Sequence, residues 1–130
     1  MDPTVCREHI DKLLVEEADA LARLERLLDR EYDLLVTNSV DELERTGEQR
    51  QACVGELIRI DDERRSLCRM MNVPADKTGL ERLMSWCDPS HSLQQRWADC
   101  AERATRCRAA NARNGALVTA RLKRVEGMLD

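Results

Sequence analysis

The sequence predicts an all-α protein: a long antiparallel helical hairpin and a long C-terminal helix, which together form a three- to four-helix bundle or coiled-coil-like arrangement. Ala, Glu, Lys, Leu and Arg supply 64 of the 130 residues, the usage of long helices when a helical period accompanies it. The aromatic residues are only Tyr32, Trp86 and Trp97, whereas sheets draw on aromatic and β-branched residues. At this length we expect one helical domain, residues 1–130.

The first helix is predicted over residues 4–38. Pro3 suits a first helical turn, and nothing interrupts the helical pattern before the sequence Thr37-Asn38-Ser39. Leucines repeat every seven residues, and a second apolar series runs beside them: Leu14, Leu21, Leu28 and Leu35, then Leu13, Ala20, Leu27 and Leu34. This stripe is wider than a two-stranded coiled-coil seam and typical of a helix in a bundle.

The second helix is predicted over residues 40–71, where Pro74 follows its end. Ser39 and Glu42 have the spacing of a capping box at its start. Because the connection between the first two helices is short, we expect them to be antiparallel.

Residues 75–88 are expected to form a connector with one short helix, in which Thr78 and Glu81 have capping-box spacing. Pro89 then begins the last helix, predicted over residues 89–129.

The last helix has an apolar stripe and a basic flank. At about 100° per residue, one arc of about 80° holds the apolar residues Leu93, Trp97, Cys100, Ala104, Cys107, Val118, Leu122, Val125 and Leu129. An adjacent arc holds Arg103, Arg106, Arg113, Arg121 and Arg124. A basic amphipathic helix suits a membrane surface, a nucleic acid or a partner helix, or it packs against an acidic face of its own chain.

The apolar stripe is interrupted at one place. Asn111 lies at its centre, with Asn114 at one edge and Gly115 at the other. A polar side chain in a helix seam lowers stability but can fix register or partner choice, and a glycine lets another backbone approach closely. Two interpretations stay open: an interaction site, or a tolerated polar gap at a loose point of the bundle.

Charge is distributed unevenly along the chain. Residues 1–87 hold 13 basic and 20 acidic residues, a net charge of −7, whereas residues 88–130 hold 8 and 5, a net charge of +3. This asymmetry indicates internal complementarity or an anionic partner. With no apolar run long enough to span a membrane and no signal-peptide pattern at the N-terminus, we expect a cytoplasmic protein without stable membrane insertion.

Catalytic and metal sites find little support. The five glycines are dispersed, and His9 and His91 are isolated. The six cysteines include no close Cys/His pair of the kind that binds zinc, so buried hydrophobic thiols are the preferred interpretation. We therefore expect no enzyme activity, no cofactor and no metal.

The segment Asn111-Ala-Arg-Asn114-Gly115, followed by Leu117 and Val118, resembles the N-x-x-N-G segment of the FlgN-type flagellar export chaperones. Trp97, Cys107-Arg108, the leucine-rich first helix and the stretch from Glu63 to Leu67 are also similar to that family, so the resemblance runs from about Leu13 to Leu129. Two features depart from it: Asn72 stands where many members carry glycine, and the polar turn around Gly47 is unusual.

The resemblance implies a small cytoplasmic helical chaperone without chemistry of its own. Such proteins bind C-terminal helical segments of the hook–filament junction (hook-associated) proteins, prevent their premature assembly and deliver them to the type III export gate and ATPase machinery. Carried over by position, the partner-binding residues are Asn111, Asn114, Gly115, Val118, Leu122, Val125 and Leu129. An amphipathic helix with a free apolar face can complete a bundle with a client helix, and it is also expected to allow homo-oligomers through the C-terminal helix.

Two alternatives share these features. A non-catalytic helical adaptor or coiled-coil scaffold has the same composition. Binding of RNA or DNA through the arginine flank is disfavoured, because the chain has almost no aromatic residues on which bases could stack.

Overall fold

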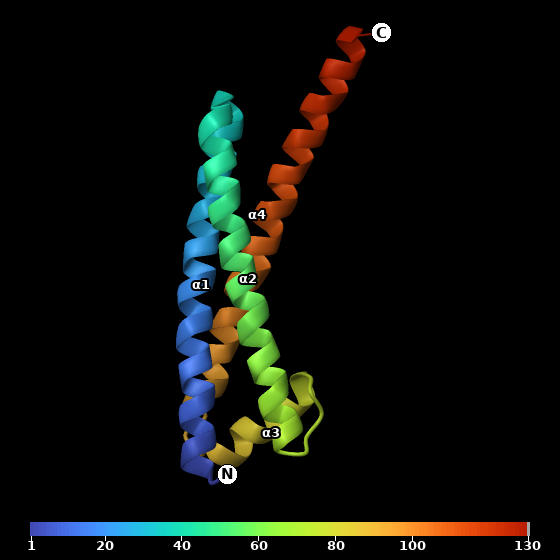
Figure 1. Ribbon diagram of the computed structural model, residues 1–130. Coiled ribbons are helices and arrows are strands. Elements are labelled where there is room, and N and C mark those ends of the chain that lie inside the picture. The colour runs from blue at the N-terminus through green and yellow to red at the C-terminus, as the bar shows by residue number, and fades with distance from the viewer. Residues whose placement is uncertain (130) are drawn as a thin grey trace.

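The computed structural model describes residues 1–129, and within them the chain is helical without strands, which confirms the all-α fold class. The four helices are α1 (Pro3–Thr37), α2 (Val40–Met70), α3 (Lys77–Cys87) and α4 (Ser92–Leu129). Figure 1 shows α1 and α2 side by side as a long hairpin, α3 across the end that also holds the N-terminus, and α4 running back along α1. The far end of α4 diverges from the hairpin.

The hairpin turns within two residues, and its geometry explains why a helix ends there. Asn38 adopts φ 58°, and its backbone N–H bonds to carbonyl oxygens of the last turn of α1. Asparagine tolerates this left-handed conformation better than most residues. Asn72, just beyond α2, has the same φ of 58°. A glycine suits such a position, and asparagine replaces it at a modest cost.

Two predicted capping boxes are wrong. Ser39 makes no side-chain capping bond to α2; its hydroxyl is 3.0 Å from the hydroxyl of Thr37 instead. At α3 the cap is Asp76, whose Oδ1 accepts a hydrogen bond from the N–H of Gly79 at 3.1 Å, rather than Thr78. Aspartate precedes the helix here and reaches the same unpaired N–H groups that a threonine cap would reach.

The last helix begins at Ser92, three residues later than Pro89. His91 adopts φ 62°, so the chain turns once more before it becomes helical. Asp88, which is buried, accepts hydrogen bonds from the N–H of Leu93 at 2.8 Å and from the hydroxyl of Ser90 at 2.6 Å. These bonds lower the pKa of the Asp88 carboxyl, the one from Ser90 most strongly.

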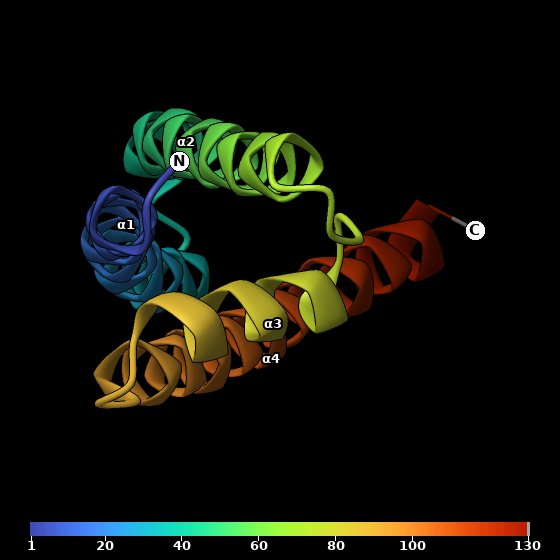
Figure 2. The ribbon, with the colours of Figure 1, turned by 90° about the horizontal axis from the view of Figure 1, so that it is seen from below.

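The core lies along α1, which contacts each of the other three helices. Helix α1 packs against both α2 and α4, and no Cα atom of α2 lies within 8 Å of one of α4 in residues 1–129. Figure 2 shows α3 spanning from the α2 side to α4. The core cluster draws on every helix: Ile10, Leu14, Leu21, Leu24 and Leu28 from α1, Leu67 from α2, Leu80, Leu83 and Met84 from α3, and Leu93 from α4.

The cysteines complete this core. All six thiols are free and buried, as the sequence predicts for small hydrophobic side chains. Burial, together with the neighbouring thiol of Cys87 in α3, raises the pKa of the Cys6 thiol in α1 to about 11. Thiols with raised pKa values react slowly, since the thiolate is the nucleophile.

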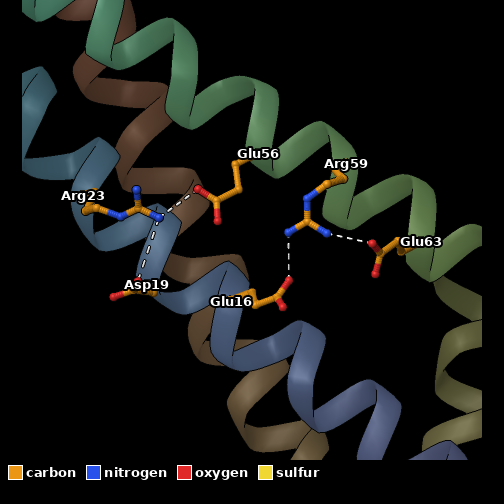
Figure 3. Close-up of polar contacts among 6 residues, drawn as sticks. All are labelled: Glu16, Asp19, Arg23, Glu56, Arg59 and Glu63. Carbon is orange, nitrogen blue, oxygen red and sulfur yellow. Dashed lines mark hydrogen bonds and ion pairs between the residues drawn. The ribbon is translucent and has the colours of Figure 1, made fainter.

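Ion pairs join the two helices of the hairpin. Figure 3 shows Arg23 of α1 between Asp19 and Glu56, and Arg59 of α2 between Glu16 and Glu63. One pair is largely buried: Arg64 donates two hydrogen bonds to Glu17, at 3.0 and 2.8 Å. Glu17, which interrupts the leucine stripe of α1 in the sequence, therefore faces a cation rather than apolar side chains.

Candidate functional site

Helix α4 contacts α1 through a row of residues spaced by seven. Leu93, Cys100, Cys107 and Asn114 are all buried, and we call them the buried seam. Their chemistry changes along the helix, from leucine through cysteine to asparagine. The next position in the series is Arg121, which is half-buried. The side of α4 that faces α1 thus becomes polar toward the C-terminus.

Asn114 ends the buried seam with a contact to the backbone of α1. Its Nδ2 donates a hydrogen bond to the carbonyl oxygen of Leu28 at 2.8 Å, and its Oδ1 accepts one from Nε of Arg113 at 3.1 Å. The side chain is 6% exposed. Both ends of the amide are therefore satisfied inside the chain, as a buried polar group requires.

The arginines of α4 bind α1 in succession. Arg103 and Arg106 both approach Glu25, and the hydrogen bond from Arg106 lowers the pKa of that carboxyl. Arg113 stacks on the ring of Tyr32 at 4.2 Å. It also pairs with Asp29 at 3.4 Å.

The series ends with Arg121, which donates to Oδ1 of Asn38 at the hairpin tip, at 2.7 Å. Of the interpretations that the sequence left open, packing against acidic residues of the same chain accounts for Arg103, Arg106 and Arg113. Arg121 binds the neutral amide of Asn38.

A second face of α4 remains uncovered by the rest of the chain. Residues 111, 115, 118, 122, 125 and 129 follow one another at alternating steps of four and three, all are exposed, and we call them the exposed seam. Val118 is 41% exposed, Leu122 59%, Val125 56% and Leu129 81%. Within residues 1–129, no residue of α4 beyond Asn114 is buried. An apolar row this open is typical of a surface that binds another protein.

The structure separates residues that the sequence placed on a single stripe. Leu93, Cys100 and Cys107 are buried against α1, whereas Val118, Leu122, Val125 and Leu129 are not. The stripe drifts around α4 because it does not keep one spacing throughout, and α4 itself leaves the hairpin (Figure 1). The two asparagines also exchange roles: Asn114, predicted at the edge, is buried, and Asn111, predicted at the centre, is exposed.

Gly115 is exposed, and a Cβ atom added to it would meet no atom within 4 Å. The close backbone approach that a glycine permits is therefore not used by a segment within residues 1–129. Space next to Gly115 is open to a partner.

Sequence reasoning missed the part of the hairpin that faces the exposed half of α4. Tyr32 contacts Arg113, and Val36 lies one turn later on the same side of α1. Val36 is 52% exposed. Tyr32 and Val36 are four residues apart and therefore share a side of α1. In the sequence this pair cannot be distinguished from the apolar pattern of the leucines around it.

No helix in the described part of the chain is apolar over enough residues to cross a bilayer. Among residues 1–129 there is also no group of three or more His, Cys, Asp or Glu side chains placed to hold a metal ion.

A family model described as FlgN protein matches residues 7–130, nearly the whole chain. No curated protein and no solved structure matches significantly.

Proposed function

The chain belongs to the FlgN protein family, a family of flagellar export chaperones, and we propose that its clients are the hook-associated proteins of the hook–filament junction. In this proposal the protein acts in the cytoplasm, binds the C-terminal helical segment of a client and keeps that segment from assembling prematurely. It then delivers the client to the export gate and ATPase machinery. The task requires binding and release, and no chemistry.

The observation that carries the proposal is the apolar row on α4 that stays exposed beyond Asn114, the last buried residue of that helix. The apolar residues Val118, Leu122, Val125 and Leu129 extend over about 17 Å of helix at 1.5 Å per residue. A client helix laid along this row would bury apolar surface that the free chain exposes to water.

The remaining assigned residues have different roles in this proposal. Asn111 and Gly115 continue the exposed seam toward the hairpin, where Gly115 admits a close approach. Asn114 holds α4 on α1 through Leu28 and so positions the seam. Val36 adds an apolar contact on the hairpin side.

Nucleic-acid binding is disfavoured because the hairpin already binds these arginines: carboxylates of α1 bind Arg103, Arg106 and Arg113, and Asn38 in the turn after α1 binds Arg121. A helical adaptor or scaffold remains the alternative, and it would not recognise client C-terminal peptides.

The test is binding of a synthetic peptide that spans the C-terminal helix of a hook-associated protein from the same bacterium, measured by isothermal titration calorimetry. We expect one peptide per chain and complete loss of binding when the chain is truncated after Ala116. The truncation removes no buried residue of α4. Circular dichroism should therefore show that the truncated chain is still folded. Unchanged binding by the truncated chain would exclude the exposed seam as the site.

The family role can fail separately from the site. If the full-length chain ignores client peptides but forms stable assemblies of its own, the scaffold function is favoured. Hydrogen exchange offers a second measurement: the amides of residues 117–129 should gain protection when peptide is added.

A further inference from the structure

We propose that the client helix lies between α2 and α4 and contacts both, so that it completes a four-helix bundle on the hairpin-tip side of α3. This inference rests on the proposed function and adds a second wall, formed by α2, to the site on α4. A helix held between two walls needs an apolar surface that covers two adjacent sides.

Helices α2 and α4 do not pack against each other. In residues 1–129 no Cα atom of α2 lies within 8 Å of one of α4, although both helices pack against α1. Two helices in direct contact have axes only about 8–10 Å apart. Figure 2 shows α2 and α4 on different sides of α1, with the connection from α2 to α3 spanning the side between them. At the α3 end, both helices line a cavity of about 120 Å³, through Asp61 and Cys68 of α2 and Trp97 of α4.

A row of residues spaced by seven continues from this cavity along α2, and we call it the α2 row: Cys68, Asp61, Val54, Gly47 and Val40. Four of its members directly follow residues of α2 that are buried, namely Thr46, Cys53, Ile60 and Leu67. One residue corresponds to about 100° around a helix. The ion-paired residues Glu56 and Glu63 of Figure 3 lie on the other side of that buried row. The α2 row therefore lies on the α4 side of α2.

The α2 row is apolar and uncovered toward the hairpin tip. Val54 is 36% exposed and Val40 is 71% exposed. Neither valine belongs to the core cluster. The part of α2 that lies opposite the exposed seam thus offers a second apolar surface.

Helix α4 has a matching row that begins at the same cavity, and we call it the α4 row: Trp97, Ala104, Asn111, Val118 and Val125. Its first four members each come four residues after a member of the buried seam, which places them about 40° around the helix. Arg106 and Arg113, which bind α1, lie on the opposite side of the buried seam. Trp97 and Ala104 are half-buried, and the later members are exposed. The two rows therefore start together at α3 and become uncovered toward the hairpin tip.

Two glycines lie at the same height on the two walls. Gly47 precedes Arg50 by one turn, and Arg50 pairs with Glu31 of α1. Gly115 follows the residue that bonds to Leu28 of α1. A Cβ atom added to Gly115 would meet nothing within 4 Å, and one added to Gly47 would meet only the end of the Arg50 side chain, at 3.8 Å. A helix between α2 and α4 would use both glycines for close backbone contact.

Charges at the edges of the two walls indicate the chemistry of the occupant. Arg108 of α4 and Glu44 of α2 are exposed, and no ion pair within residues 1–129 includes either of them. Arg108 lies nearer α3, and Glu44 lies nearer the hairpin tip. The complementary client helix has an acidic residue beside Arg108 and a basic residue beside Glu44, which fixes its direction.

Two glycine substitutions on α2 test the second wall with the client peptide and the calorimetry described above. Gly47→Leu places a side chain between α2 and α4. Gly55→Leu is the matched control, because Gly55 lies in the same helix, also has open space around it, and faces a groove shared with His9 of α1. We expect Gly47→Leu to weaken peptide binding at least about tenfold and Gly55→Leu to change it less than about twofold. Equal binding by the two variants would overturn the inference.

Two valine substitutions give an independent measurement. Val54→Asp places a charge on the α2 row. Val15→Asp changes an equally accessible valine, 54% exposed, on the face of α1 that also holds Asp29, the partner of Arg113. Val54→Asp should lose at least about tenfold in affinity, whereas Val15→Asp should bind as the native chain does. Urea unfolding confirms that all four variants are folded, and native affinity in folded Val54→Asp would contradict the second wall.

Reversing one charge tests the chemistry of the occupant. Arg108→Glu should weaken peptide binding at low salt, and the difference from the native chain should shrink as salt is added, because exposed charges are screened. An unchanged affinity at low salt would contradict the predicted acidic neighbour.

The inference and the proposed function can be distinguished when one fails. If truncation after Ala116 abolishes binding while Gly47→Leu and Val54→Asp bind normally, α4 alone forms the site, so the second wall is wrong and the chaperone function stands. If the native chain binds no client peptide, the proposed function fails and the inference fails with it.

Discussion

The side-chain amide of Asn114 donates a hydrogen bond to the main-chain carbonyl of Leu28, 86 residues earlier in the chain. This bond is the last buried contact of α4 with α1 in residues 1–129. Before it α4 belongs to the core, and after it one face of α4 is open. The polar residue thus lies at the junction between the part of the helix that holds the fold and the part assigned to partners.

Replacing Asn114 by alanine should lower the free energy of unfolding by about 1–2 kcal/mol, because a satisfied, buried amide is lost and a gap is left. Asn111→Ala is the matched control: the same change on the exposed side of the helix should stay within about 0.5 kcal/mol. Urea denaturation measures both. Equal effects at the two positions would show that Asn114 is not the anchor.

Two glycines should respond to alanine in opposite directions. At Gly115 the added Cβ meets open space, so Gly115→Ala should raise the free energy of unfolding by up to about 1 kcal/mol through helix propensity. At Gly79 the added Cβ would overlap the carbonyl oxygen of Pro74, and the backbone before α3 would have to move. In thermal unfolding, the melting temperature of Gly79→Ala should be well below that of the native protein. An unchanged melting temperature would mean that the turn before α3 can move to accommodate the added Cβ atom.

The Glu17–Arg64 pair predicts strong coupling between two substitutions. Arg64→Met alone leaves the Glu17 carboxylate without its partner, in a site where this side chain is only 12% exposed. The substitution should therefore lower the free energy of unfolding by about 3 kcal/mol. Glu17→Leu combined with Arg64→Met should recover most of that loss, because apolar groups then replace both charges. A double-mutant cycle in urea checks this, and additive losses would argue against a direct interaction.

Asp88 predicts a pH dependence in acid. Its pKa is lowered from the ordinary value of 3.8 by the bonds from Ser90 and Leu93. Since the folded pKa lies below the unfolded one, the ionised carboxylate stabilises the fold above pH 3.8, and this contribution disappears as the pH falls through the folded pKa. The stability of Asp88→Asn should therefore fall less steeply than that of the native protein between roughly pH 5 and pH 2. Urea midpoints measured across this range compare the two slopes, and parallel curves would contradict the assignment.

Local patterns in the sequence were enough to predict most of the helical content. The leucine repeat of the first helix predicts a buried stripe, and Leu14, Leu21, Leu28 and Leu35 are indeed buried. Periodicity works here because each step depends only on helix geometry and on the preference of apolar side chains for a core.

The helix caps were less predictable. Ser39 and Thr78 have suitable spacing, but Asp76 and Asp88 make the capping bonds at α3 and α4. Several polar residues near a helix start can reach the same N–H groups, and the path of the connecting chain decides which one does.

The sequence by itself determined that this chain forms long helices, that its cysteines suit a core, and that its last helix has an apolar stripe interrupted by Asn111, Asn114 and Gly115. Contacts between distant parts of the chain determine which asparagine is buried, where α4 leaves α1, and which arginines bind the hairpin. The physical reason is that helical periodicity specifies which residues share a face. It does not specify what covers that face, because this depends on contacts such as Asn114 to Leu28 between residues far apart in the chain.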